Sequence, residues 1–192
     1  MKQTRLYVDQ DEILYRSNGN GANVQSGAAE KFALLMMRCW VRALTSEKGS
    51  SQIHEALNIW NKGFCSVGGM EASKSFDHFM SLLARKSIKR LQVGCPKCKE
   101  PNQDEQRILN ILSSYQRGKA DTGTATLKYW LEGHDSQLAE HHIILFVAAL
   151  NRQDYRFRDN KRREVVTKGL KASPLTQDFM LSPEVFASKT IH

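Results

Sequence analysis

Apolar residues recur with a helical period through most of this chain, and that spacing constrains the fold more than any other feature. The first periodic stretch begins at Ser26, where apolar positions follow one another at intervals of three and four residues. They are Phe32, Leu35, Met36, Cys39, Trp40 and Ala43. Residues at these intervals lie on one face of an α-helix. The pattern therefore predicts an amphipathic helix that buries this face.

Five further stretches with a helical character follow before Asn151. Ser50 or Ser51 is expected to cap the second helix, after a stop near Gly49, and Val67-Gly68-Gly69 to end it. The apolar faces of the second and third helices are expected to comprise Ile53, Leu57, Trp60 and Phe64, then Phe76, Phe79, Met80, Leu83 and Leu91.

The fourth helix carries the clearest start signal in the sequence. Asn102 can accept a hydrogen bond from a free backbone N–H of the first turn, and Glu105 can reach back to the Asn102 amide. Asp104 and Glu105 also stand at the positive end of the helix dipole. We therefore expect a capping box at Asn102 and a helix that ends at Gly118. Its apolar face comprises Ile108, Leu109, Leu112 and Tyr115.

Two shorter signals predict the last helices. Asp121 or Thr122 is expected to open the fifth, and Gly133 to end it, after which Asp135 or Ser136 caps the sixth. Their apolar residues are expected to be Leu127, Trp130 and Leu131, then Leu138, His142, Leu145, Phe146, Ala149 and Leu150.

Six helices joined by short connections are typical of a helical bundle. Strands and helices do not alternate, which argues against a parallel α/β sheet. We predict an all-α protein with a compact bundle of about six helices over residues 26–151. Residues 1–25 are expected to form a short N-terminal appendage with a small hairpin, and residues 152–192 a basic, partly ordered extension.

Charge and apolar runs bear on partners and compartment. The chain has 28 Lys and Arg against 20 Asp and Glu, a formal net charge of +8, which favours polyanions as non-specific neighbours. Its longest purely apolar run, Ile143 to Leu150, is far shorter than the ~20 residues that span a bilayer. The N-terminus carries no secretory signal pattern. We expect a cytoplasmic protein with reduced thiols and no membrane partner.

The segment Cys95-Pro96-Lys97-Cys98 is the most suggestive motif, and three interpretations of it remain open. Two cysteines at this spacing can form half of a structural zinc site, as a knuckle. The same pattern occurs in thiol–disulfide chemistry, where nearby lysines and a helix N-terminus depress a thiol pKa. The third interpretation, which we favour, is a proline-bounded loop with cysteines as small apolar plugs. The further ligands that zinc needs would have to come from Cys39, Cys65, His134, His141 or His142, none of which has matching spacing.

A second candidate site is a basic cluster near the end of the predicted bundle. It comprises Arg152, Arg156, Arg158, Lys161, Arg162 and Arg163. Tyr155 and Phe157 lie between these residues, a composition found in phosphate-binding arms that also stack on bases. Asp154, Asp159 and Glu164 dilute the charge, so a solvated helix or a subunit-contact arm fits equally well.

The order of several short motifs resembles that of a known group of proteins. The pieces are a helix with Arg38, Cys39 and Trp40, a helix with Phe76 and Phe79, then Cys95-Pro96, Asp104-Glu105 with Leu109, and Gln116-Arg117-Gly118. In these the chain resembles a group of small, uncharacterised, all-helical bacterial proteins over residues 28–152. The resemblance implies an all-α fold and no activity. Cys98 and the basic extension depart from the pattern.

No known catalytic fingerprint occurs in the chain, and no acid, base and nucleophile stand at catalytic spacing. We therefore expect neither catalytic residues nor a cofactor. The function predicted from the sequence is that of a non-enzymatic interaction or adaptor protein, with a protein partner or self-association. The alternative is a nucleic-acid-binding regulator that uses the basic extension.

Overall fold

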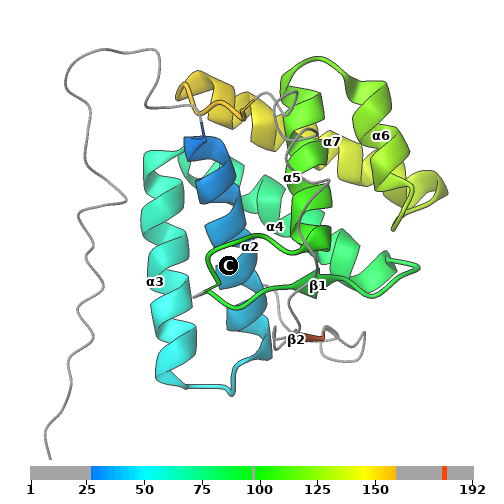
Figure 1. The fold of residues 1–192 in the computed structure, drawn as a ribbon. Coiled ribbons are helices and arrows are strands. Elements are labelled where there is room, and N and C mark those ends of the chain that lie inside the picture. Colours follow the sequence, from blue (N-terminus) through cyan, green and yellow to red (C-terminus); the bar gives the residue numbers. More distant parts are fainter. Residues whose placement is uncertain (1–26, 97, 159–178, 181–192) are drawn as a thin grey trace, which may run out of the picture.

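The structure is a computed structural model that describes residues 27–96, 98–158 and 179–180. Helices dominate these residues (Figure 1). They are α2 (Ala28–Thr45), α3 (Ser51–Ser66), α4 (Gly69–Lys86), α5 (Gln103–Gln116), α6 (Ala120–Leu127) and α7 (Gly133–Arg152). The predicted all-α bundle of six helices is confirmed. The hairpin predicted in residues 1–25 lies outside the described residues.

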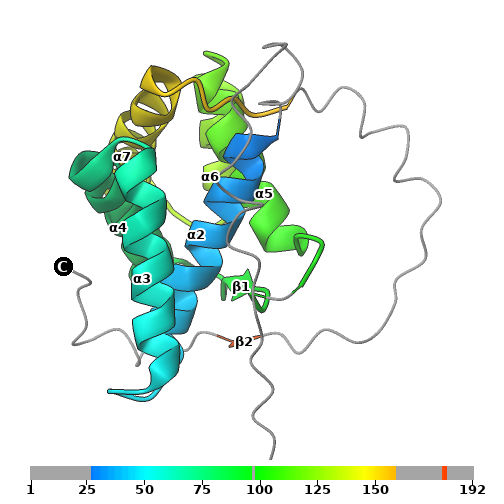
Figure 2. The same cartoon turned by 90° about the vertical axis from the view of Figure 1, so that its left-hand side faces the viewer.

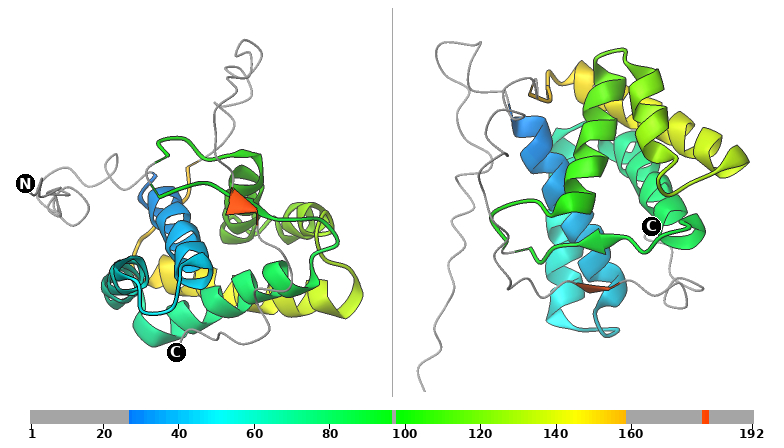
Figure 3. Two further views of the ribbon diagram at one scale, coloured as in Figure 1. Left: turned by 90° about the horizontal axis from the view of Figure 1, so that it is seen from below. Right: turned by 45° about the vertical axis from the view of Figure 1, so that its right-hand side comes forward.

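The helices pack in neighbouring pairs, α2 with α3, α4 with α7, and α5 with α6. Figure 2 shows α4 and α7 together at one edge of the bundle. A two-residue strand, β1 (Gln92–Val93), pairs antiparallel with β2 (Phe179–Met180). Figure 3 shows the connection that carries β1 crossing between α4 and α5, where it contacts α2 and α5. This connection also contains the predicted Cys95–Cys98 motif.

Aromatic rings from four helices fill the centre. Phe76 of α4 lies 4.7 Å from Phe146 of α7 between ring centroids, and Trp60 and Phe64 of α3 lie 4.6 Å apart. Phe32 of α2 meets Phe64 edge-on at 5.3 Å. Edge and tilted contacts of this kind stabilise a core beyond the area they bury. The predicted inward faces of α2 and α4 are thus confirmed in their aromatic positions.

The prediction for the last helix is wrong in two respects. α7 begins at Gly133, with Glu132 as its N-cap, so neither Asp135 nor Ser136 caps it. Leu138, predicted to face the core, is 37% exposed. The buried face of α7 instead comprises Ser136, Ala139, Ile143, Phe146, Val147, Ala149 and Leu150. The spacing of apolar residues did not predict the buried face of this helix, because the continuous apolar run 143–150 extends over more than two helical turns. Such a run places apolar residues on every side of the helix.

Smaller differences concern where helices end. Trp130 and Leu131 are buried as predicted, but α6 ends before them at Leu127. Leu91 is also buried, although it follows the end of α4. The N-cap of α3 is Ser50, which is one of the two residues predicted for this position. Its side chain nevertheless accepts no capping hydrogen bond.

Packed structure continues past Asn151 into the predicted extension. Phe157 is 6% exposed, and Tyr155 packs against the core. The side chain of Gln116 holds this segment by two bonds, since it donates to the Tyr155 carbonyl and accepts from the Phe157 amide, both at 2.7 Å. Residues 153–158 are therefore part of the folded body. None of the described helices combines the length and the apolar composition needed to cross a bilayer.

Candidate functional site

A buried ion pair joins the middle of α2 to the start of α5. Arg38 Nε donates to Glu105 Oε1 at 2.8 Å, and Arg38 Nη2 to Glu105 Oε2 at 2.9 Å. The two side chains are only 4% and 0% exposed. Burial alone would lower the pKa of Arg38, but the hydrogen bonds and charge of Glu105 outweigh burial and raise it. The pair is bidentate, the geometry in which a guanidinium binds a carboxylate most strongly.

Other groups complete the hydrogen bonding of this pair. Glu105 accepts from the amides of Gly94 at 3.0 Å and Asn102 at 2.8 Å, and Arg38 donates to the carbonyls of Cys98 and Glu100. Asn102 Oδ1 in turn accepts from the Glu105 amide, so the predicted capping box is confirmed. We call this set, Arg38, Glu105 and Asn102 with the backbone of residues 94, 98, 100 and 102, the Arg38–Glu105 clamp. It fastens the loop before α5 to the bundle.

The Cys95–Cys98 motif lies in the loop that the clamp holds. Both residues are half-buried and neither forms a disulfide, and the Cys98 amide donates to the Cys95 carbonyl at 3.0 Å. The pKa of Cys98 is raised, chiefly by a hydrogen bond with the Cys95 side chain and by burial. This is opposite to the depressed thiol pKa that the redox interpretation expected, because α5 begins only at Gln103 and its N-terminus is already occupied by the clamp.

The described residues contain no group of three or more His, Cys, Asp or Glu side chains that could hold a metal ion. Cys39 is buried in α2, where burial raises its pKa to about 12, and Cys65 is exposed on α3. The structure therefore does not bring the other candidate ligands His134, His141 and His142 to Cys95 and Cys98.

The described arginines of the predicted basic cluster have polar contacts on the bundle. Arg152 pairs with Glu71 at 2.9 Å, and Arg156 contacts Asn151 at 2.8 Å and Asp154 at 3.5 Å. The backbone amide of Arg158 donates to Glu30. Phe157 is buried, so it is not a stacking platform for a base. Lys161, Arg162 and Arg163 lie outside the described residues.

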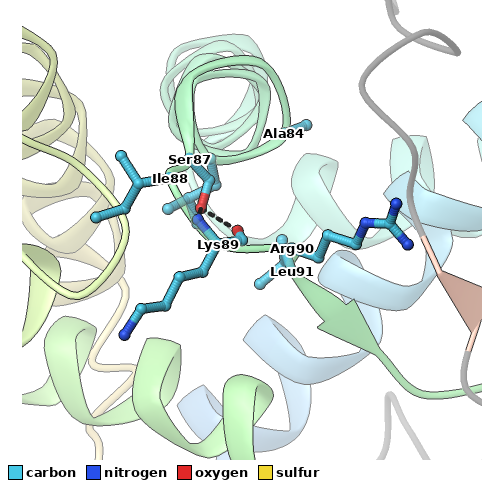
Figure 4. Close-up of a pocket in the computed structure, with 7 residues that line it drawn as sticks. Ala84, Ser87, Ile88, Lys89, Arg90 and Leu91 are labelled. Atoms are coloured by element: carbon cyan, nitrogen blue, oxygen red, sulfur yellow. Dashed lines mark hydrogen bonds between the residues drawn. The ribbon is translucent and has the colours of Figure 1, made fainter.

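A second basic segment, absent from the predicted sites, joins α4 to β1. It comprises Arg85, Lys86, Lys89 and Arg90, and we call it the basic turn. A shallow pocket lies here, lined by Leu83, Ala84 and residues 87–91; in Figure 4 the Lys89 and Arg90 side chains extend in different directions from the backbone. Lys89 Nζ sits 3.7 Å from the centroid of the Tyr129 ring, and the Arg107 guanidinium 4.3 Å. The sequence could have predicted this basic segment, because four of the six residues 85–90 are Lys or Arg.

An apolar stripe lies on the side of α7 that turns away from the core. Ile144 is 53% exposed and Leu138 37%, while Leu145 and Ala148 are half-buried and His141 is exposed. We call these five residues the α7 outer face. It lies opposite the buried face of α7, and the helices in contact with α7 are α4, α5 and α6.

Two histidines stack where α4 meets α7. The rings of His78 and His142 lie 4.8 Å apart and nearly parallel, and His78 Nδ1 is 2.6 Å from the Lys74 carbonyl oxygen. The pKa of His142 is lowered, first by burial and then by the charges of His78 and His141. The sequence placed His142 in the apolar face of α7, and the structure finds it half-buried at the edge of that face.

Comparisons of this chain with protein-family models, with curated proteins and with solved structures each gave no match.

Proposed function

We propose that this protein is a non-enzymatic interaction protein that self-associates through the α7 outer face. The observation that carries the proposal is an exposed apolar stripe on a helix that already buries its opposite face. Scattered exposed apolar residues are normal on protein surfaces, but several apolar residues gathered on one helix face favour an interaction site. The partner we commit to is a second copy of the chain.

The spacing of the stripe favours a helical partner. Leu138, His141, Leu145 and Ala148 follow one another at intervals of three, four and three residues. This is the spacing of the a and d positions along one seam of a two-helix coiled coil. Ala148 allows close approach at one end of the seam, and the larger Leu138 occupies the other end. An antiparallel partner would therefore oppose a large residue to a small one.

The charges at the ends of α7 favour an antiparallel copy. Its first turn is acidic through Asp135 and its last turn basic through Arg152. In an antiparallel pair, the acidic turn of each helix faces the basic turn of the other, and the two helix dipoles oppose. A register that sets Leu138 against Ala148 of the second copy also sets His141 against Leu145. The same register brings Asp135 near Arg152 of the second copy, so the apolar and charged contacts agree.

The size of the seam limits its strength. α7 has 20 residues, so it is about 30 Å long, and its outer face covers only the middle of that length. A contact limited to the middle of one helix from each copy falls below the roughly 2,000 Å² or more that obligate dimers bury. We therefore expect a reversible dimer whose fraction rises with concentration.

Sedimentation velocity over a concentration series tests this proposal. The wild type should shift from the monomer towards the dimer mass. The double variant Leu138→Glu/Ile144→Glu should remain monomeric, since in each copy it places one carboxylate in the seam, at residue 138, and one beside the seam on the same outer face, at residue 144. Met70→Glu is the matched control, because Met70 is 71% exposed on α4 but lies outside the α7 outer face. A wild type that stays monomeric throughout, or a double variant that dimerises like the control, contradicts the proposal.

A second candidate function is binding of a nucleic-acid backbone by the basic turn. The observation that favours it is a group of positive charges with no neighbouring negative charge among the described residues to balance them. The side chains of Arg85, Lys86 and Lys89 form no ion pair with any described carboxylate. Arg152, by contrast, is paired with Glu71. Cations without a carboxylate partner are the ones that can neutralise phosphates and release counterions.

The salt dependence of binding to a generic duplex tests this second candidate. If the basic turn contacts phosphates, replacing Arg85, Lys86, Lys89 and Arg90 by Gln should flatten the slope of log K against log salt by about 0.9 for each phosphate that is no longer neutralised. The matched variant replaces Arg152, Arg156 and Arg158 by Gln and should change the slope less. Equal slopes for both variants and the wild type would exclude the basic turn.

A further inference from the structure

We propose that Cys95 and Cys98 form a dithiol site that exchanges with small disulfides and closes an intramolecular disulfide. This inference is independent of the proposed self-association. It concerns the motif in the clamped loop, for which the sequence left zinc, redox and purely structural interpretations open.

The loop already holds the two residues in a geometry that suits a disulfide. The Cys98 amide donates to the Cys95 carbonyl at 3.0 Å, which closes a tight turn from residue i to residue i+3. Such a turn keeps the first and last Cα atoms within ~7 Å, and disulfides span Cα distances of about 4.4–6.8 Å. The two side chains also hydrogen-bond with each other. Closing the bond therefore needs only small movements of the two side chains.

The clamp fixes both flanks of this turn. Glu105 accepts from the Gly94 amide at 3.0 Å on one side, and Arg38 donates to the Glu100 carbonyl at 3.0 Å on the other. Arg38 also donates to the Cys98 carbonyl, so its guanidinium lies near both sulfurs. A loop held at both ends loses little conformational entropy when its two thiols join. The hydrogen bond with Cys95 and burial raise the pKa of Cys98, and the charge of Arg38 acts in the opposite direction, towards the thiolate.

A cysteine that exchanges with a small disulfide and then closes an intramolecular one must be accessible and must have a second thiol beside it. Cys39 and Cys65 each lack one of these two properties. Cys39 is 3% exposed, and burial raises its pKa to about 12, so it seldom forms a thiolate at neutral pH. Cys65 is exposed on α3, a helix whose sequence contains no second cysteine. Cys95 and Cys98 are the two cysteines that combine partial exposure with a neighbouring thiol. Cys95 and Cys98 should therefore form a disulfide with each other, whereas Cys39 and Cys65 should form no intramolecular disulfide.

The exchange needs an oxidant of the disulfide class, such as glutathione disulfide. One protein thiol loses its proton, and the thiolate attacks a sulfur of that disulfide, which forms a mixed disulfide and expels one glutathione thiolate. The second protein thiol then loses its proton and attacks the protein sulfur of the mixed disulfide, which expels the other glutathione. The protein pair loses two electrons and two protons, and the glutathione disulfide gains them as two thiols.

Equilibration of the full chain in glutathione buffers of stepped ratio tests the site. After an acid quench, alkylation and peptide mass analysis, the peptide with Cys95 and Cys98 should lose two hydrogen atoms at ratios that leave Cys65 unpaired. Cys95→Ala and Cys98→Ala should each abolish that species and leave only a mixed disulfide at the remaining thiol. Cys65→Ala is the matched control and should not change the midpoint ratio.

Two results would overturn the proposal. One is a Cys95–Cys98 pair that remains fully alkylated at every ratio at which Cys65 carries glutathione. The other is stoichiometric zinc in protein purified without chelator, lost in both alanine variants, because that result would make the pair part of a metal site instead.

Discussion

Folded proteins usually bury apolar side chains and expose charged ones, and two regions of this molecule depart from that rule in opposite ways. They are the Arg38–Glu105 clamp and the α7 outer face. The clamp buries two charges between α2 and the start of α5, with exposures of 4% and 0%. The outer face places apolar side chains in water, with Ile144 at 53% exposure. One region is polar inside and the other apolar outside, yet among the described residues only the clamp has all its partners present.

The difference lies in whether each region satisfies its own chemistry. Glu105 meets Arg38 through two bonds and accepts from two backbone amides, so the clamp requires no further partner. The stripe that includes Leu138 and Ile144 leaves these two apolar side chains exposed. A buried polar group with all partners present is a structural feature. The exposed apolar stripe is the surface through which we propose that the protein self-associates.

The largest effect should come from breaking the clamp. Glu105→Ala leaves the Arg38 guanidinium buried without a counter-charge and frees the Gly94 and Asn102 amides, which should lower the free energy of unfolding by about 3–5 kcal/mol. Urea denaturation measures this loss. Glu71→Ala is the control, since Glu71 is 58% exposed in its pair with Arg152 and should cost at most about 1 kcal/mol. Equal losses in the two variants would show that the clamp is not a special feature.

A smaller effect is expected at the helix caps. Asn102→Ala removes the bond from the Glu105 amide to Asn102 Oδ1, 2.8 Å long, and should cost about 1 kcal/mol of unfolding free energy. Ser50→Ala is the matched control, because Ser50 is an N-cap without a side-chain bond and should change the midpoint little. If both changes cost the same, the capping box does not contribute what its geometry implies.

The smallest effect concerns the inner edge of α7, where His142 meets His78. Because burial and the neighbouring histidines lower the pKa of His142 in the folded protein, the unfolded chain binds a proton first as the pH falls. Stability should therefore decrease as the pH drops below the ordinary histidine range, and be retained above it. Denaturation midpoints at neutral and mildly acid pH measure this. His142→Gln should weaken the dependence; an unchanged dependence would assign it to other groups.

The helices and the capping box could be predicted because their signals are local. Asn102 and Glu105 are three residues apart, so one turn of helix suffices to relate them. The partner of Glu105 could not be predicted in the same way, since Arg38 lies 67 residues away and only the packing of α2 on α5 brings them together. In the sequence, the capping box is a sufficient explanation for a glutamate at position 105. No neighbouring residue indicates that Glu105 also forms a buried ion pair.

The exposed side of α7 was mispredicted for a related reason. A run of apolar residues fits several helical faces equally well, and Leu138, at the expected spacing from His142 and Leu145, was assigned to the core. The neighbours α4 and α5 determine which face is buried, and a single sequence does not state their positions. The burial of Phe157 beyond the last helix depends in the same way on distant Gln116.

The most direct test measures mass and unfolding on the same samples of three proteins: the wild type, Glu105→Ala and Leu138→Glu/Ile144→Glu. Light scattering at high concentration gives the mass, and urea denaturation at a dilution where all are monomeric gives the stability. We predict that Glu105→Ala loses stability and keeps the dimer mass wherever it is folded, while the double variant loses the dimer mass and keeps its midpoint. A double variant that unfolds as readily as Glu105→Ala, or that retains the dimer mass, would contradict the account.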